Sequence, residues 1–337
     1  MAVARIDERA RTLSALFAAT DWPDFEQAAR PHGVHAQANA VRRHVALFQG
    51  HPAAAYLQAA FNSGARNPQP YFALAMHLTW PDFAAGEGSA PLLGESAPIR
   101  AAEFGAHLRD FHETARLAEY WDANKAAWEE AAAAVGAHVA DVSFRAFLAR
   151  FLGEVPQEIV CIPNPLYPTQ VSMGVATPGT LFCLVPPRRA VGESPPWPFE
   201  ADREHVLNAV IQSAFGALLR PFLADHDAAV QRARALDHLL GFDAAFRKRY
   251  PDWETQLARL LTLAATALFL DEIDPGAGDS FTLFERRTSG LRNLPVVVLA
   301  LRGYLDQQRA GNYNNVAEYL PQLASDVQAT LGKLGVS

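Results

Sequence analysis

Apolar residues recur every three or four positions along most of the chain, a spacing that places them on one face of a helix. Proline or glycine interrupts the pattern between segments, as expected at helix ends. Before residue 153 the pattern predicts an amphipathic first helix over 10–19 and helices over 35–48, 51–64, 104–121, 124–140 and 142–153. After residue 201 it predicts helices over 202–221, 228–242, 252–273, 295–310 and 316–334, whereas 86–98 has the composition of a loop.

Residues 154–200 differ from the regions on either side in their composition. Three segments, 158–166, 170–177 and 180–187, have the β-branched and aromatic content of short strands, and Pro178-Gly179 predicts a turn between the last two. A proline-rich loop follows. The expected fold class is therefore mainly α (α+β). It consists of a helical N-terminal region (1–153), a small antiparallel β-layer with its loop (154–200) and a helical C-terminal region (201–337), together forming one two-lobed unit.

The helix expected at 202–221 has the clearest pattern in the chain. Asp202 is a suitable N-cap, Glu204 is in the first turn, and Pro221 is expected to end the helix. Apolar pairs repeat every four residues and form a broad buried face. The opposite stripe is polar or small and consists of His205, Asn208, Gln212, Gly216 and Arg220.

Charge and composition exclude several classes of function. The chain has 337 residues, with 29 Lys and Arg against 36 Asp and Glu and a net charge of −7, so no nucleic-acid partner is expected. No stretch approaches the roughly 18 uninterrupted apolar residues of a membrane span. Without a signal-peptide pattern, the expected location is cytoplasmic. Cys161 and Cys183 lie in apolar strand-like segments, which predicts buried, reduced thiols.

No catalytic motif is complete in the sequence. His112-Glu113 begins like the HExxH helix of zinc peptidases, but the fifth position is Arg116, which cannot bind a metal, so His112 and Glu113 are expected to face solvent. Asp225-His226-Asp227 are consecutive and do not converge on one cation in regular structure, so capping or a solvated loop is expected. We therefore predict no catalytic residue, no metal ligand and no cofactor.

The order of several segments resembles a bacterial zincin-like (gluzincin-type) family of unknown function, whose members carry a helix of the form HEFSHxFxxP. The matching segments are 51–78, 108–131, 158–166 and 301–323, the last with Arg309, Tyr313 and Pro321 at the family's positions. The likeness runs from about residue 44 to residue 325. The resemblance implies a substrate cleft between two lobes, with an edge strand above a central zinc-binding helix.

The resemblance departs from the family at its metal site. Aligning Pro221 with the motif proline places Gln212 and Gly216 on the two histidines, Ser213 on the general-base glutamate, and the third ligand near Arg259. Gln is a poor zinc ligand, Gly has no side chain and Arg repels a cation, so the resemblance implies a lost metal site. The vestigial cleft it implies is lined by Asn208, Gln212, Ser213, Gly216, Arg259 and Tyr313.

Three hypotheses follow. The first is a catalytically inactive zincin-like protein, a pseudo-metallopeptidase, that binds a peptide or protein in the vestigial cleft. The second is an active metal-dependent hydrolase with an unusual ligand set, His205 with Asp225 or His226. The third is a structural helical protein for assembly, in which the polar stripe packs against the C-terminal helices. Gly216 in mid-helix costs roughly 1 kcal/mol relative to Ala, which indicates either close backbone approach or drift. The sequence leaves the ligand and the oligomeric state open.

Overall fold

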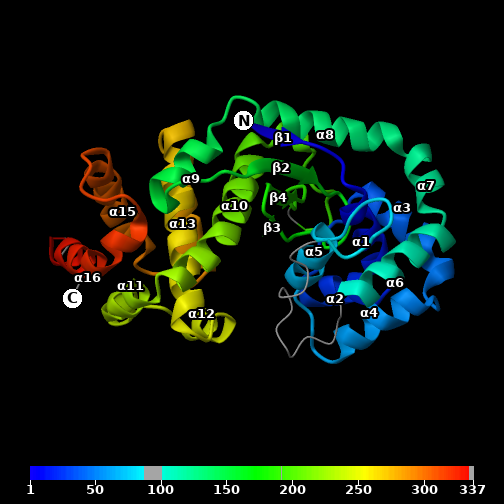
Figure 1. Cartoon of the computed structure of the whole chain (residues 1–337), viewed down its shortest axis with the longest axis horizontal. Helices are drawn as coiled ribbons and strands as arrows, with labels where there is room; N and C mark the ends of the chain where they lie inside the picture. Colours follow the sequence, from blue (N-terminus) through cyan, green and yellow to red (C-terminus); the bar gives the residue numbers. More distant parts are fainter. Residues whose placement is uncertain (87–100, 191, 334–337) are drawn as a thin grey trace. The chain divides into compact units, whose positions relative to one another are not determined.

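The computed structural model describes residues 1–86, 101–190 and 192–333. Within these ranges the chain forms sixteen α-helices and one four-stranded mixed sheet, and helix makes up 65% of the structure (Figure 1). The prediction of a mainly α (α+β) fold is confirmed. The loop expected at 86–98 lies, apart from Gly86, outside the described residues.

The chain divides into two compact units. Unit 1 comprises Met1–Val142 and Gln157–Ser213, and unit 2 comprises Ser143–Pro156 and Ala214–Ser337. The regions predicted from the sequence follow composition, whereas these units follow packing. The elements of unit 1 are β1 (Ala2–Ala4), α1 (Glu8–Ala18), α2 (Trp22–Ala29), α3 (Ala36–Val45), η1 (Ala46–Phe48), α4 (Pro52–Asn62), α5 (Gln69–Met76), α6 (Ala101–Thr114), α7 (Leu117–Ala123), α8 (Lys125–Val139), β2 (Glu158–Pro163), β3 (Met173–Ala176), β4 (Thr180–Val185) and η2 (Phe199–Ala201).

The remaining helices lie in unit 2, apart from α10, which begins in unit 1 and ends in unit 2. The elements are α9 (Phe144–Leu152), α10 (Arg203–Asp225), α11 (Asp227–Arg232), η3 (Ala233–His238), α12 (Ala244–Arg249), α13 (Trp253–Ile273), α14 (Ala277–Thr288), α15 (Leu294–Arg309) and α16 (Val316–Lys333).

The sheet of unit 1 has the strand order β1-β2-β4-β3. β1 pairs in parallel with β2 and β2 with β4, while β3 is antiparallel to β4. The hairpin turn at Pro178-Gly179 is confirmed, since it joins β3 to β4. The prediction of a purely antiparallel layer is wrong, because the chain crosses from β2 to the edge strand β3 and returns beside β2 as β4. β2 and β4 are buried almost throughout, as in strands covered on both faces. The helix α8 contacts β1 and β2, and α5 contacts β3.

The two cysteines lie side by side on neighbouring strands of this sheet. Cys161 in β2 and Cys183 in β4 are register partners, and both are buried free thiols, as predicted. Burial raises the pKa of the Cys161 thiol to about 12 and also raises that of Cys183, because a thiolate is poorly solvated in the interior. Both thiols are therefore protonated at neutral pH, which makes them poor nucleophiles.

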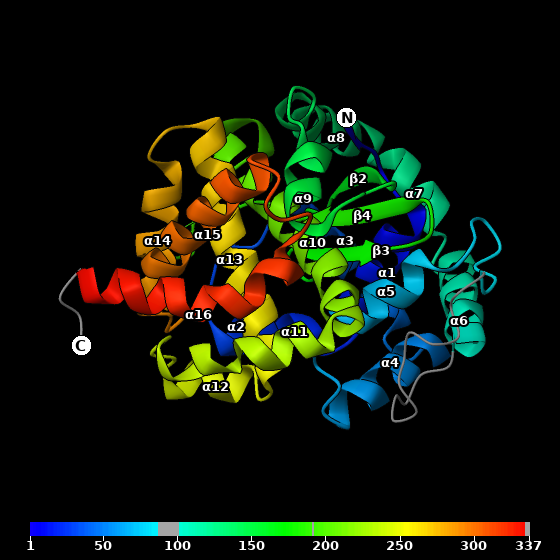
Figure 2. The ribbon, with the colours of Figure 1, turned by 60° about the vertical axis from the view of Figure 1, so that its left-hand side comes forward.

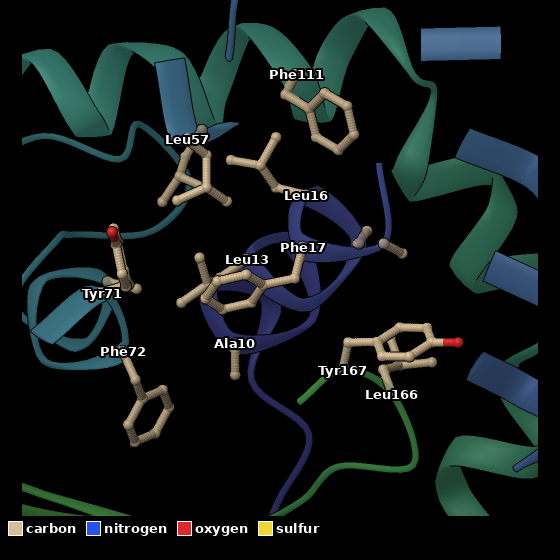
Figure 3. Packing of buried hydrophobic residues seen from close by; sticks show 14 of the residues in the cluster. Ala10, Leu13, Leu16, Phe17, Leu57, Tyr71, Phe72, Phe111, Leu166 and Tyr167 are labelled. Atoms are coloured by element: carbon tan, nitrogen blue, oxygen red, sulfur yellow. The ribbon is translucent and has the colours of Figure 1, made fainter. Parts of the chain in front are cut away.

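The core of unit 1 surrounds α1. Asp7 caps this helix by accepting hydrogen bonds from the backbone N–H groups of Arg9 and Ala10. Leu16 and Phe17 on α1 have no exposed surface. Figure 3 shows side chains from α4, α5, α6 and the loop after β2 packed around α1, among them Leu57, Tyr71, Phe72, Phe111, Leu166 and Tyr167.

The N-terminus differs from the prediction in two ways. Residues 2–4 form the strand β1, and the helix that follows is buried on nearly all sides rather than on one face. Arg11, a charged residue of this helix, is only 7% exposed. Its guanidinium carbon lies 4.9 Å from the ring centroid of Trp121 and 5.1 Å from that of Trp128, and its side chain pairs with Glu8. These contacts replace the water that an exposed arginine would have.

The helix α10 starts as predicted but ends later. Asp202 accepts a hydrogen bond from the backbone N–H of His205 at 3.1 Å, which caps the first turn. Pro221 does not end the helix, which continues to Asp225. A proline inside a helix removes one backbone hydrogen bond. Leu223, in the last turn of the helix, is buried, and this burial offsets part of that loss.

Unit 2 is built around α13. This helix is buried along most of its length and contacts α14 and α15, while α16 packs against α15, α11 and η3 (Figure 2). The helix α9 is attached to α13 and to α15 by two interactions of Arg150. Its guanidinium forms an ion pair with Glu272 at 2.6 Å, and its carbonyl accepts a hydrogen bond from the Tyr304 hydroxyl at 2.6 Å.

In the described residues, α10 is long and apolar enough to cross a membrane, and so are α8 and α9 if the bent pair is one span. More than half of the α10 window is buried inside the protein. The core helix of a folded protein has the same length and hydropathy, so these values are weak evidence for a span.

Candidate functional site

The first turn of α10 lies beside the end of β4. The Nε2 atom of His205 is 3.0 Å from the carbonyl oxygen of Pro186, which directly follows β4. Burial lowers the pKa of His205, although the bond to Pro186 and the nearby Asp202 carboxylate oppose this shift. His205 is therefore a donor to the backbone that fixes the start of α10.

One turn further on, the predicted polar stripe forms a direct contact. Nε2 of Gln212 donates to Oδ1 of Asn208 at 2.6 Å, an interaction between residues four apart on the helix. Ser213 follows and is 5% exposed. Its hydroxyl has no hydrogen-bond partner among the described residues. A buried hydroxyl without a partner is costly, so Ser213 is an unusual choice for this position.

The other three predicted residues lie in unit 2. Gly216 is half-buried on α10, and a Cβ atom built there would meet no heavy atom within 4 Å outside the backbone of its own helix. Close backbone approach is therefore not the reason for glycine at this position. Arg259 is half-buried on α13. Tyr313 is half-buried, with its ring centroid 5.4 Å from that of Tyr319 and 6.1 Å from that of Tyr304.

The residues at the motif positions do not fit a zinc ion. Zinc sites in proteins are built from thiolate, imidazole and carboxylate groups. Gln212 offers an amide that already donates to Asn208, Ser213 a neutral hydroxyl, and Gly216 no side chain. The described part of the chain contains no group of three or more His, Cys, Asp or Glu side chains placed to hold a metal ion.

The alternative ligand set of His205 with Asp225 or His226 is contradicted by α10 itself. His205 lies in the first turn of α10, Asp225 is its last residue, and His226 directly follows it. At a rise of 1.5 Å per residue, the helix advances about 30 Å from His205 to Asp225, far more than two ligands of one ion can be apart. His226 instead places Nδ1 2.8 Å from the carbonyl oxygen of Phe222, in the preceding turn.

His112 also departs from the prediction, because it does not face solvent. It is half-buried, its Nδ1 lies 3.0 Å from the Thr12 hydroxyl, and its ring packs against Trp80 and Phe83. Burial lowers its pKa, and the nearby Arg11 lowers it further. Glu113 is exposed, as predicted.

A second polar cluster, which the sequence did not indicate, lies in the loops that follow β2 and β4. It contains Thr169 and Gln170 after β2, Arg189 after β4, and Arg30 and His32 after α2. These residues are up to 159 positions apart and match no motif. The dipeptide Arg188-Arg189 is the one feature of the sequence that points to this cluster, and alone it indicates no more than a solvated surface.

The helices and the sheet together define a mainly α protein with a small mixed sheet. Comparison with protein-family models, with curated proteins and with solved structures finds no match to this chain. The zincin-like resemblance therefore rests on the segments quoted above and stays a prediction, as do the cytoplasmic location and the expectation of a peptide or protein ligand.

Proposed function

We propose that this chain is a zincin-like protein without a catalytic metal site, and that it acts by binding a peptide or protein along the polar stripe of α10. The observation that carries the proposal is the set of side chains at the motif positions. Gln212, Ser213 and Gly216 stand where the family has two histidines and a glutamate.

The chemistry of these residues supports binding rather than hydrolysis. A metallopeptidase needs a carboxylate near the metal to deprotonate the attacking water, and Ser213 cannot do this at neutral pH. Asn208 and Gln212 carry amides, which are both donors and acceptors and match the backbone groups of a peptide. Their mutual hydrogen bond orients the two amides in advance, which lowers the entropy cost of binding.

Metal content is the first test of the lost metal site. The protein is purified untagged and without chelator, dialysed against zinc, and analysed for metal by mass spectrometry. We expect far less than one zinc per chain. About one tightly held zinc per chain, released when Gln212 is changed to Ala, would overturn the proposal.

Restoring the motif tests the zincin-like architecture directly. The variant Q212H/S213E/G216H recreates HExxH on α10 and is expected to bind one zinc through two histidines four residues apart. Adding Arg259→Glu should tighten zinc binding at least tenfold if residue 259 stands at the third ligand position. Arg249→Glu makes the same charge change at an exposed position of α12 and should leave the affinity unchanged. Equal effects of the two glutamates would refute the architecture.

Binding along α10 is tested by panning a random peptide library against the wild-type protein. We expect the selected peptides to lose at least tenfold in affinity for N208A/Q212A and to keep their affinity for Glu204→Gln, an exposed change on the same helix. A library that yields no saturable binder, or peptides that bind N208A/Q212A as well as wild type, would overturn the binding function.

A further inference from the structure

Three loops of unit 1 lie together at one edge of the sheet. β2 and β4 are parallel, so the loops that follow them, 164–172 and 186–198, leave the same edge. The segment after α2 is tied to the second loop, because the backbone N–H of Gly33 donates to the carbonyl of Gly192 at 3.1 Å. The α-carbon of Gly33 also lies so close to the Ser194 carbonyl that no side chain fits between them.

The centre of this loop cluster is His32, which is only 5% exposed. Its Nδ1 lies 2.9 Å from the carbonyl oxygen of Arg30, and its Nε2 lies 2.9 Å from the hydroxyl of Thr169. The Thr169 hydroxyl and backbone N–H both donate to the carboxylate of Glu26 on α2. The imidazole is thus fixed on both sides, and it connects the backbone of residue 30 with the loop after β2.

A further pair of contacts extends this network to Arg189. The amide nitrogen of Gln170 lies 2.8 Å from Nδ1 of His32, and its amide oxygen accepts a hydrogen bond from Nη1 of Arg189 at 2.7 Å. The guanidinium of Arg189 is therefore oriented by a neutral partner, the amide of Gln170. Arg30, whose backbone carbonyl oxygen lies 2.9 Å from Nδ1 of His32, is exposed at the same loop cluster.

The two arginines are without an ion-pair partner in the described part of the chain. Neither Arg30 nor Arg189 forms an ion pair there, whereas the adjacent Arg188 pairs with Asp202 at 3.2 Å. The nearby Glu26 is engaged by Thr169 and by the indole N–H of Trp22. Desolvation lowers the pKa of Arg189, and the positive charge of Arg30 lowers it further. A chain of net charge −7 thus keeps two like charges near each other.

We propose that Arg30 and Arg189 form a binding site for an oxyanion, the phosphate or carboxylate group of a ligand, at the loop edge of unit 1. Guanidinium groups bind such oxyanions with two parallel hydrogen bonds each, and a ligand charge would remove the repulsion between the arginines. Gln170 is a positioning residue, since it holds Arg189 in place. The site is independent of the proposed loss of zinc on α10.

Inorganic phosphate is the probe for this site. Binding is measured by NMR titration or calorimetry at constant ionic strength, with chloride as the reference anion. We expect saturable binding of one phosphate per chain, at least tenfold weaker in Arg30→Gln and in Arg189→Gln. Arg188→Gln is the matched control, because its guanidinium is already neutralised by Asp202, and its affinity should stay within twofold of wild type.

Gln170→Glu is a second test that does not depend on removing a charge from the arginines. It places a carboxylate where Gln170 now accepts from Arg189, and this internal anion should reduce phosphate affinity at least tenfold. Acetate and phenylphosphonate, titrated separately, show whether carboxylate or phosphate is preferred. The proposal is overturned if wild type binds none of these anions saturably, or if Arg188→Gln weakens binding as much as Arg189→Gln.

Discussion

Replacing Gly33 by alanine should separate two loops of unit 1. A Cβ atom at residue 33 would lie 1.8 Å from the carbonyl oxygen of Ser194, 2.5 Å from its carbonyl carbon and 2.7 Å from the carbonyl oxygen of Glu193. All three are backbone atoms, so no side-chain rotation relieves the overlap. The loop 192–194 must therefore move away from residue 33.

The cost of that movement follows from the contacts that are lost. Overpacking by one methyl group in a tight place typically costs 1–3 kcal/mol, and the hydrogen bond from Gly33 N–H to the Gly192 carbonyl contributes about 1 kcal/mol. We therefore expect G33A to lower the free energy of unfolding by about 2–4 kcal/mol. Because the same contact aligns Arg30 with the loop of Arg189, phosphate affinity should fall as well.

Urea unfolding followed by circular dichroism measures this change. Gly179→Ala is the control, because a Cβ atom at residue 179 meets nothing within 4 Å, and its free energy of unfolding should change by less than about 1 kcal/mol. If G33A is as stable as G179A and binds phosphate like wild type, then the contact between residues 33 and 194 does not exist in solution.

Two further predictions concern α3 and α1. Nδ1 of His35 caps α3 by accepting from the Gln37 N–H at 3.1 Å, and burial lowers its pKa, so the unfolded chain binds this proton more tightly. The neutral imidazole of His35 stabilises the folded state fully above pH 6.5, and this stabilisation is lost as the pH falls from there through the lowered folded-state pKa. His35→Asn caps α3 at every pH, so it should reduce the change in the free energy of unfolding between pH 7.5 and pH 5.0, measured by urea unfolding. An unchanged pH dependence would contradict the assignment of His35 as the cap. Leu16→Ala should lower the free energy of unfolding by about 2–5 kcal/mol in the same assay. Leu47→Ala, at an 89% exposed site, should leave it almost unchanged. Similar values for the two variants would show that the core around α1 is wrongly placed.

Local sequence signals predicted the parts of the fold that depend on neighbouring residues. Helical spacing located α13 and α15, and Pro178-Gly179 located the β3–β4 hairpin, because each depends on residues a few positions apart. The strand β1 has three residues and pairs with β2 more than 150 positions later, so no local periodicity marks it. The parallel pairing of β2 with β4 was missed for the same reason, since strand order is a long-range property.

The two candidate sites also differ in whether they depend on residues close together or far apart in the sequence. The stripe of Asn208 and Gln212 was predicted because residues four apart on a helix are neighbours, and the structure joins them by a hydrogen bond. The contact of His32 with Thr169 spans 137 positions and depends on the sheet edge to bring the loops together. Burial is the other property that spacing did not give, as His112 shows, since it was expected to face solvent and is half-buried.

Gly216 on α10 tests whether the space around the middle of this helix is open in solution. Glycine inside a helix costs about 1 kcal/mol relative to alanine, and a Cβ atom at this position meets nothing within 4 Å. Gly216→Ala should therefore stabilise the protein by about 0.5–1 kcal/mol in urea unfolding. Gly278→Ala on α14 is the opposite control, because its Cβ atom would lie 2.1 Å from the Ala267 carbonyl oxygen, and it should destabilise. Stabilisation by Gly216→Ala would show that packing does not require glycine at this position. If both variants destabilise, the space above residue 216 is filled in solution, and the polar stripe of α10 is a packed surface rather than a binding face.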